Sequence, residues 1–155
     1  MSDPESEAVD LPPRRKILGH TPPAWIGSGA TYFITICTIP RKLNQLAIDS
    51  TANAIFEAVT HRHEHHRWHC RLMLLMPDHL HALIAFSSTT TMKSEVAGFK
   101  RFVARHTGVT WQRDFFDHRI RDAENLQEKA RYIRQNPVRA KLVKHRKDWP
   151  YIWSR

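Results

Sequence analysis

The sequence predicts one α+β domain of the ferredoxin-like, split βαβ kind, with a central antiparallel sheet and helices packed on it. Three observations predict this class. Strand-like and helix-like segments follow one another in the order strand, helix, strand, strand, helix, strand, helix. The two consecutive strands are joined by a tight turn, which makes them antiparallel neighbours. The chain has 155 residues, enough to bury one core without a disulfide or a structural metal.

The first half of the chain supplies three strands and one helix. Residues 31–39 (TYFITICTI) are β-branched and aromatic, which is typical of a strand. Apolar residues at helical spacing predict a helix over residues 45–67. Residues 68–76 and 79–86 are predicted strands, and residues 77–78 form the turn between them.

The second half alternates between the two kinds of element. Residues 92–106 place their apolar side chains on one stripe, which predicts an amphipathic helix. Residues 115–121 are predicted as a short strand, and residues 124–135 as a helix with an inward apolar stripe of Leu126, Ala130 and Ile133. We expect Pro137 to end that helix, because the residue before a proline disfavours the α conformation.

The start of the chain differs from the rest in composition. Residues 1–21 are predicted to be a flexible arm, acidic at first and then basic, and residues 22–155 to be the single domain. Trp25 and Ile26 are candidates for packing onto the core. No secretory signal is recognisable at the start, and no apolar run approaches the roughly 18 residues of a membrane span, so we expect a cytoplasmic protein.

The charge balance points to a polyanion. The formal net charge is +9 with a pI near 10.1, although residues 1–10 carry four acids and no base. Such a domain favours nucleic acid as its partner, and a merely solvated surface is the alternative. Cys37 and Cys70 lie inside apolar runs, which indicates buried reduced thiols rather than a disulfide.

His79 and His81 are separated by one residue in a predicted strand. Residues i and i+2 of a strand share a face, so the two imidazoles can bind one metal ion while Leu80 points into the core. The pair is weak evidence when taken alone, because the histidines at 61–69 repeat the same spacing. Two polar side chains on a solvated strand face are the alternative, and a solvated basic helix end is the favoured interpretation of residues 61–69.

Tyr132 and Asn136 are four residues apart and lie on one face of the predicted helix. That face is about a quarter-turn from the apolar stripe, so Tyr132 is expected at the margin of the buried surface. An ordinary boundary tyrosine is the alternative. Asn136 has a second interpretation, as the N-cap of a short helix that begins at Pro137 and runs to Val143.

Three segments together resemble the REP-associated tyrosine transposases, a branch of the single-tyrosine HUH transposases. These are LMPDHLHALI (75–84), WQRDFFDHRIRDAENL (111–126) and ARYIRQNPVRAKLV (130–143), and the resemblance spans roughly residues 22–150. Two positions depart from the family pattern. Asp78 stands where many relatives have asparagine, which we expect to matter little in a turn, and Lys141 stands where glycine is common.

The resemblance implies a ferredoxin-like domain that cuts single-stranded DNA at a REP-like hairpin. Tyr132 would be the nucleophile that forms a 5′-phosphotyrosine, and His79, His81 and Asn136 would hold Mg²⁺ or Mn²⁺. Relatives occur as monomers and as homodimers, and both remain open. Basic side chains are expected to hold the hairpin backbone, and the candidates are Lys100, Arg101, Arg105, Arg113, Arg119, Arg121 and Arg139.

Two other functions remain open. A hairpin-binding protein without cleavage activity would need only the basic surface. A metal-dependent hydrolase of another substrate would use the histidine pair and leave Tyr132 dispensable. The aromatic and basic residues at 111–116 are equally consistent with base stacking and with packing in the core.

Overall fold

The computed structural model describes residues 29–155, so the expectations for residues 1–28 lie outside it. Five antiparallel strands form one sheet in the order β4-β1-β3-β2-β5. The strands are β1 (Thr31–Cys37), β2 (Trp68–Leu75), β3 (His79–Phe86), β4 (Phe116–Ile120) and β5 (Ile152–Ser154).

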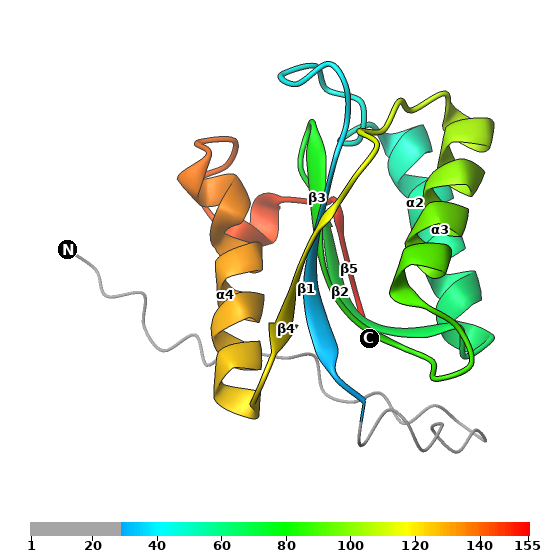
Figure 1. Cartoon of the computed structure of the whole chain (residues 1–155). Helices are drawn as coiled ribbons and strands as arrows, with labels where there is room; N and C mark the ends of the chain where they lie inside the picture. The colour runs from blue at the N-terminus through cyan, green and yellow to red at the C-terminus, as the bar shows by residue number, and fades with distance from the viewer. Residues whose placement is uncertain (1–28) are drawn as a thin grey trace.

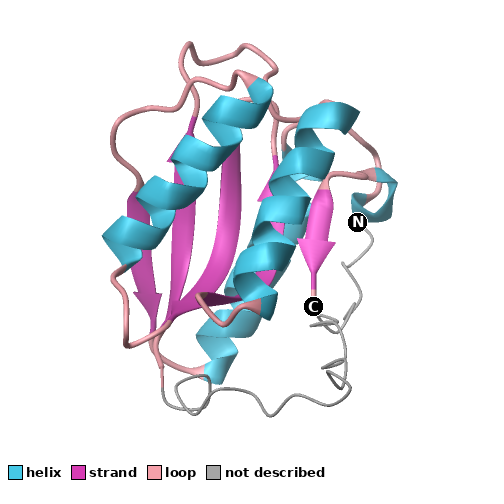
Figure 2. Cartoon of the chain, turned by 90° about the vertical axis from the view of Figure 1, so that its right-hand side faces the viewer, coloured by secondary structure: helices cyan, strands magenta, loops and turns pink. Residues whose placement is uncertain are grey.

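Three helices cover the two faces of this sheet. Helices α2 (Asp49–Glu64) and α3 (Met92–Thr107) lie side by side on one face, and α4 (Ala123–Arg139) lies on the other (Figure 1). Figure 2 looks onto the face that α2 and α3 cover. The first four strands with α2 and α3 make the β-α-β-β-α-β order of the ferredoxin-like fold, so the predicted fold class is confirmed.

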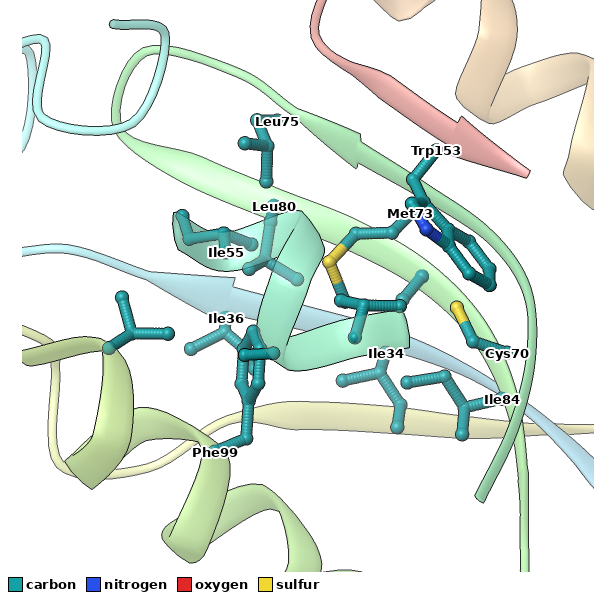
Figure 3. Close-up of a cluster of buried hydrophobic side chains, with 14 of the residues drawn as sticks. Ile34, Ile36, Ile55, Cys70, Met73, Leu75, Leu80, Ile84, Phe99 and Trp153 are labelled. Atoms are coloured by element: carbon teal, nitrogen blue, oxygen red, sulfur yellow. The ribbon is translucent and has the colours of Figure 1, made fainter. Parts of the chain in front are cut away.

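The larger core lies between the sheet and the helices α2 and α3 (Figure 3). The two-residue period of a strand sends Ile34 and Ile36 of β1 to this side and Phe33 to the other. Phe99 of α3 is fully buried, with its ring centroid 5.4 Å from that of Trp68. Burying one side chain of this size stabilises the fold by about 1.5–3 kcal/mol.

A smaller apolar cluster joins the sheet to α4. Leu72, Leu74 and Leu83 of the sheet pack in it with Ala130 and Ile133 of the helix, both fully buried. The predicted inward stripe of α4 is therefore confirmed. Because this cluster is small, α4 leaves part of its face of the sheet free for other groups.

The ends of two early elements differ from the prediction. Helix α2 begins at Asp49 rather than at residue 45. Leu46 fits the helical spacing because it is fully buried, but the backbone N–H groups of Gln45 and Leu46 donate to the Pro77 carbonyl instead of forming a helix. Strand β1 ends at Cys37, and Thr38 makes only an isolated bridge to Trp111.

Strand β5 and the short 3₁₀ helix η1 (Arg146–Asp148) are absent from the sequence prediction. Three residues are too few to show a strand period. Both elements are held by hydrogen bonds to residues distant in the sequence. The Trp153 indole donates to the Thr60 hydroxyl at 3.0 Å, and the Trp149 indole donates to the Leu75 carbonyl at 2.9 Å. This segment closes the β2 edge of the sheet.

The prediction that Pro137 ends a helix is wrong, because α4 continues through it to Arg139. A proline inside a helix removes its own N–H bond and crowds the carbonyl four residues before it, but here the proline is buried and lies two residues before the last helical residue, Arg139. The helix bond from the Ala140 N–H to the Asn136 carbonyl is kept at 2.9 Å. Asn136 is therefore a residue of the last turns of α4 and caps no second helix.

Helix α4 ends in a Schellman motif with Lys141 at the left-handed position. The Leu142 N–H donates to the Pro137 carbonyl at 2.9 Å, and the Lys141 N–H to the Val138 carbonyl at 3.0 Å. Lys141 has a φ of 61°, which is unfavourable for a residue with a Cβ atom. This conformation explains physically why glycine suits the position.

Both cysteines are free and buried, as predicted. Burial raises the pKa of the Cys70 thiol well above its usual range. Within residues 29–155, no helix has the length and apolar character that crossing a membrane requires.

We predict that Lys141→Gly raises the free energy of unfolding by about 0.5–1 kcal/mol, since glycine adopts a positive φ without strain. Urea unfolding measures the change. Lys144→Gly is the matched control, because Lys144 lies outside the residues with positive φ, and it should give no gain. Equal destabilisation by both substitutions would show that the left-handed cap carries no strain.

Candidate functional site

His79 and His81 stand at the start of β3 on the face that carries α4. Their ring centroids are 4.8 Å apart with the planes near perpendicular, and Leu80 between them is fully buried in the core on the opposite face. His81 is only 8% exposed, whereas His79 is partly buried. The pair therefore lies at the margin of the protein interior and is not on a solvated strand face.

Each imidazole has a partner at its Nδ1 atom. His79 Nδ1 lies 2.8 Å from the Asp78 carboxylate, which can only accept, so this nitrogen carries the proton. His81 Nδ1 lies 2.8 Å from the Thr35 hydroxyl, which can accept in the same way. That arrangement leaves both Nε2 lone pairs available, and such outer partners are typical of metal-binding histidines.

Asp78 connects the histidine pair to the loop after β1. One carboxylate oxygen accepts from His79, and the other accepts from Arg41 Nε at 2.9 Å and from the Lys42 backbone N–H at 2.8 Å. Burial alone would raise the pKa of Asp78, but these hydrogen bonds outweigh it and hold the pKa well below its usual range. Asp78 is therefore part of the site, while the expectation that its difference from asparagine matters little stays a prediction.

His81 is held neutral by its surroundings. Burial is the main cause that lowers its pKa to about 3, with smaller contributions from the charges of His79 and Arg139. The neutral imidazole is the form that binds a metal ion. At neutral pH no proton has to leave His81 before it could act as a ligand.

Tyr132 faces this pair from α4. Its ring centroid lies 6.4 Å from that of His81 and 6.3 Å from that of Phe33, while 49% of the residue remains exposed. The Arg139 guanidinium lies 4.1 Å from the centre of the phenol ring, and Lys129 Nζ lies 5.7 Å from it. Arg139 also donates to the Tyr132 backbone carbonyl at 2.7 Å. The phenol is thus exposed, close to the histidines and flanked by two cations.

Asn136 lies one helical turn beyond Tyr132 on the same side of α4 and is partly buried. Within residues 29–155, no group of three or more His, Cys, Asp or Glu side chains is arranged to hold a metal ion. The histidine pair supplies two nitrogens, so a metal site here needs an oxygen ligand of another kind. The side-chain amide of Asn136 is the candidate on the facing helix.

The structure divides the predicted DNA-contacting residues between two faces. Arg139 lies at Tyr132, and Arg119 and Arg121 line a pocket of about 540 Å³ near the start of α4, together with Arg71. Arg101 and Arg105 are exposed on α3, which lies on the other face of the sheet.

Lys100 and Arg113 lie close together between α3 and β4. Lys100 Nζ donates to the carbonyls of Gln112 and Arg113, at 2.6 and 3.0 Å, and burial lowers its pKa. Lys100 is therefore occupied in holding the loop before β4. Its ammonium has less freedom to meet a phosphate than the other predicted residues have.

The histidine-rich end of α2 is partly structural. His63 is buried, and its Nδ1 accepts from the Cys70 backbone N–H at 3.2 Å. His61 and His65 lie ring to ring at 4.1 Å. The solvated helix end that the sequence suggested therefore describes only part of this segment.

Sequence reasoning missed four side chains at the site. Thr35 and Phe33 come from β1, Asp78 was set aside, and Lys129 was not considered. Thr35 lies opposite His81 in the β1–β3 ladder, which can be known only once the register of the strands is known. Asp78 directly precedes His79 in the sequence, and this adjacency was the one signal that could have identified it.

Comparisons with known proteins agree with this fold. No family model matches the chain. It is 30% identical over 141 residues to a Haemophilus influenzae protein named as a REP-associated tyrosine transposase, a match that covers 79% of this chain and 78% of that protein.

Two solved structures resemble the chain. A REP-associated tyrosine transposase bound to a REP hairpin matches with a TM-score of 0.71 and 23% identity, over 80% of this chain and 76% of that chain. A Deinococcus radiodurans protein described as a transposase matches with a TM-score of 0.49 and 17% identity, over 66% of this chain and 87% of its own. The first match supports the fold, and the second is too distant to support an argument.

We predict that the stability of the metal-free protein falls as the pH drops from about 6.5 towards 3. In this range an unfolded His81 binds a proton and the folded one does not, so its contribution is present above the unfolded pKa and lost as pH approaches the folded pKa. One such group changes the free energy of unfolding by up to about 1.4 kcal/mol per pH unit.

Urea unfolding with EDTA at several pH values measures this dependence. His81→Phe should reduce the slope of the free energy of unfolding against pH by an amount equivalent to at most one bound proton. His63→Phe should reduce this slope further, because burial also lowers the pKa of His63. A slope that is unchanged in His81→Phe would contradict the assignment.

Proposed function

The chain belongs to the REP-associated tyrosine transposase family, and from this premise we propose that it cleaves single-stranded DNA at a hairpin foot and rejoins strands through a 5′-phosphotyrosine. One observation supports this proposal above others. The exposed phenol of Tyr132 lies beside two imidazoles whose Nε2 atoms are available, with cations on the same side.

A divalent cation would be held by the Nε2 atoms of His79 and His81 and by the side-chain oxygen of Asn136. When bound, it withdraws negative charge from a phosphodiester and orients the phosphorus for attack. Few protein ligands suit Mg²⁺, and imidazole suits Mn²⁺ better, so we expect activity with either and tighter binding of Mn²⁺. The fit rests on the two Nδ1 partners. Asp78 accepts from His79 and the Thr35 hydroxyl can accept from His81, which leaves both Nε2 atoms for a metal ion.

The protein's own part in the reaction begins with Tyr132. Its phenol oxygen attacks phosphorus, the bond from phosphorus to the 3′ oxygen breaks, and that oxygen leaves as a 3′-hydroxyl after taking a proton. The phenol proton is lost to solvent, which reaches the half-exposed ring. Attack by a 3′-hydroxyl on the phosphotyrosine reverses the step, so a strand is joined without an external energy source.

Arg139 and Lys129 supply positive charge where the scissile phosphate must approach. Both cations lie over the Tyr132 ring, and Arg139 is fixed there by its bond to the Tyr132 carbonyl. Fixed cations favour the growing negative charge of the transition state without having to reorganise. We expect the remaining exposed basic residues to bind the hairpin backbone with a strong salt dependence.

We predict that wild-type protein and a labelled hairpin with a single-stranded foot form a covalent adduct in Mn²⁺ but not in EDTA. Tyr132→Phe should abolish the adduct and retain hairpin binding, because only the nucleophilic oxygen is removed. A denaturing gel detects the adduct, and a native gel the binding.

A panel of hairpins, including repeats from the host genome, controls for the choice of DNA. Tight hairpin binding without any adduct across this panel would instead support a binding protein that does not cleave. Cleavage that persists in Tyr132→Phe would support a metal-dependent hydrolase that uses the histidine pair alone.

We predict that Asp78→Ala weakens Mn²⁺ binding by roughly 10- to 100-fold, because the outer hydrogen bond that orients His79 is lost. Calorimetric titration of the protein with Mn²⁺ measures this without DNA. Asp78→Asn is the matched control, since its amide oxygen can still accept from His79 and should keep most of the affinity. Equal affinity in Asp78→Ala and wild type would show that Asp78 has no part in metal binding.

A further inference from the structure

Phe116 is the most exposed large apolar side chain in residues 29–155, at 71%. Its neighbours behave differently. Trp111 and Phe115 pack against the main core, and the Trp111 indole donates to the Lys100 carbonyl at 3.0 Å. The aromatic cluster that the sequence left undecided between stacking and packing therefore divides, and Phe116 is the member that packs on nothing in the core.

The sheet places Phe116 in line with the histidine site. Phe116 lies opposite Thr35 in the β1–β4 ladder, and Thr35 lies opposite His81 in the β1–β3 ladder. Residues directly opposite one another in an antiparallel ladder project from the same face. The three side chains thus form one row across β4, β1 and β3, and with strands about 4.8 Å apart the backbone of Phe116 is about 10 Å from that of His81.

The outer part of this row is open. Helix α4 packs over β2 and β3, whereas β4 is the edge strand and its first four residues are exposed. The next row inward along β4 pairs His118, also exposed, with Phe33, whose ring meets Tyr132. In the part of the chain that the structure describes, an exposed aromatic ring thus stands beside the site, on the same face as Tyr132.

Positive charge lies near this row and at the other end of β4. Arg139 and Lys129 flank Tyr132 on one side, and beyond the far end of β4 the pocket of about 540 Å³ is lined by Arg71, Arg119 and Arg121. An exposed aromatic ring with cations nearby fits a polyanion that carries flat aromatic groups, which is single-stranded nucleic acid. Inside a base-paired duplex the base faces are stacked on one another, so only unpaired bases or the end pair could stack on such a ring.

We infer that Phe116 stacks on a nucleobase that flanks the scissile phosphate and so fixes the single-stranded foot of the hairpin in the site. This inference rests on the proposed cleavage of single-stranded DNA and adds the residue that holds the strand there. Phe116 lies two strands away from His81, a spacing of about 10 Å between their backbones, which suits a base next to the scissile phosphate. Phe116 is a DNA-binding residue that holds the strand in place, and it takes no part in bond breaking.

The test compares Phe116→Ala and Phe116→Tyr in hairpins that carry 2-aminopurine at each position of the foot in turn. At one position the fluorescence should be quenched by wild type and by Phe116→Tyr, and recover in Phe116→Ala. Stacking on one aromatic side chain is worth roughly 5- to 150-fold in affinity, so Phe116→Ala should bind the hairpin weaker by a factor in that range. Phe102→Ala is the matched control, because this ring is also exposed but lies on α3, on the other face.

An abasic nucleotide identifies the contact as stacking. At the quenched position it should weaken wild-type binding by the same factor, and it should cost Phe116→Ala nothing further. If Phe116→Ala changes neither fluorescence nor affinity, or if it weakens binding equally with the abasic hairpin, the inference is overturned. Urea unfolding checks that Phe116→Ala remains folded, which its exposure leads us to expect.

The covalent-adduct assay separates this inference from the proposed cleavage. An adduct with wild-type protein, together with no effect of Phe116→Ala, overturns the stacking and leaves the cleavage. Quenching that depends on Phe116 without any adduct overturns the cleavage and supports the stacking. A protein that binds no hairpin of the panel overturns both.

Discussion

The register of β1 against β3 is the constraint on which the rest of the site depends. It places Thr35 opposite His81 and Cys37 opposite His79, so the hydroxyl of one strand orients the imidazole of the next. A slip by one residue would send both histidines into the main core and Leu80 to the surface. The core side chains of β1 and β3 forbid that slip, and so the apolar packing on one face fixes the polar chemistry on the other.

A second constraint acts from α4, which carries the tyrosine to the histidines. Ala130 and Ile133 anchor the helix to the sheet, and Tyr132 between them is turned to the margin. Because the helix runs on through Pro137 to a Schellman end, Arg139 remains helical and can fold back over the Tyr132 ring. The helix end therefore shapes the electrostatics of the phenol, although it lies nearly two turns away.

Asp78 shows how a turn can serve both stability and chemistry. Its carboxylate holds the loop after β1 through Arg41 and Lys42 and at the same time accepts from His79. A buried carboxylate is costly unless its oxygens are satisfied, and here three donors satisfy them. The position of His79 is thus coupled to the loop, and a change at either end reaches the other.

The sequence by itself determined the alternation of strands and helices, the ferredoxin-like class, and the shared faces of His79 with His81 and of Tyr132 with Asn136. These follow from periods of two and 3.6 residues, which are local properties of a chain. Only the tertiary structure decided that α4 continues through Pro137, that β5 forms, that Thr35 and Asp78 partner the imidazoles, and that Phe116 is exposed beside them. Each of these depends on which distant segments meet, and packing between such segments outweighs the weak local preferences that a sequence displays.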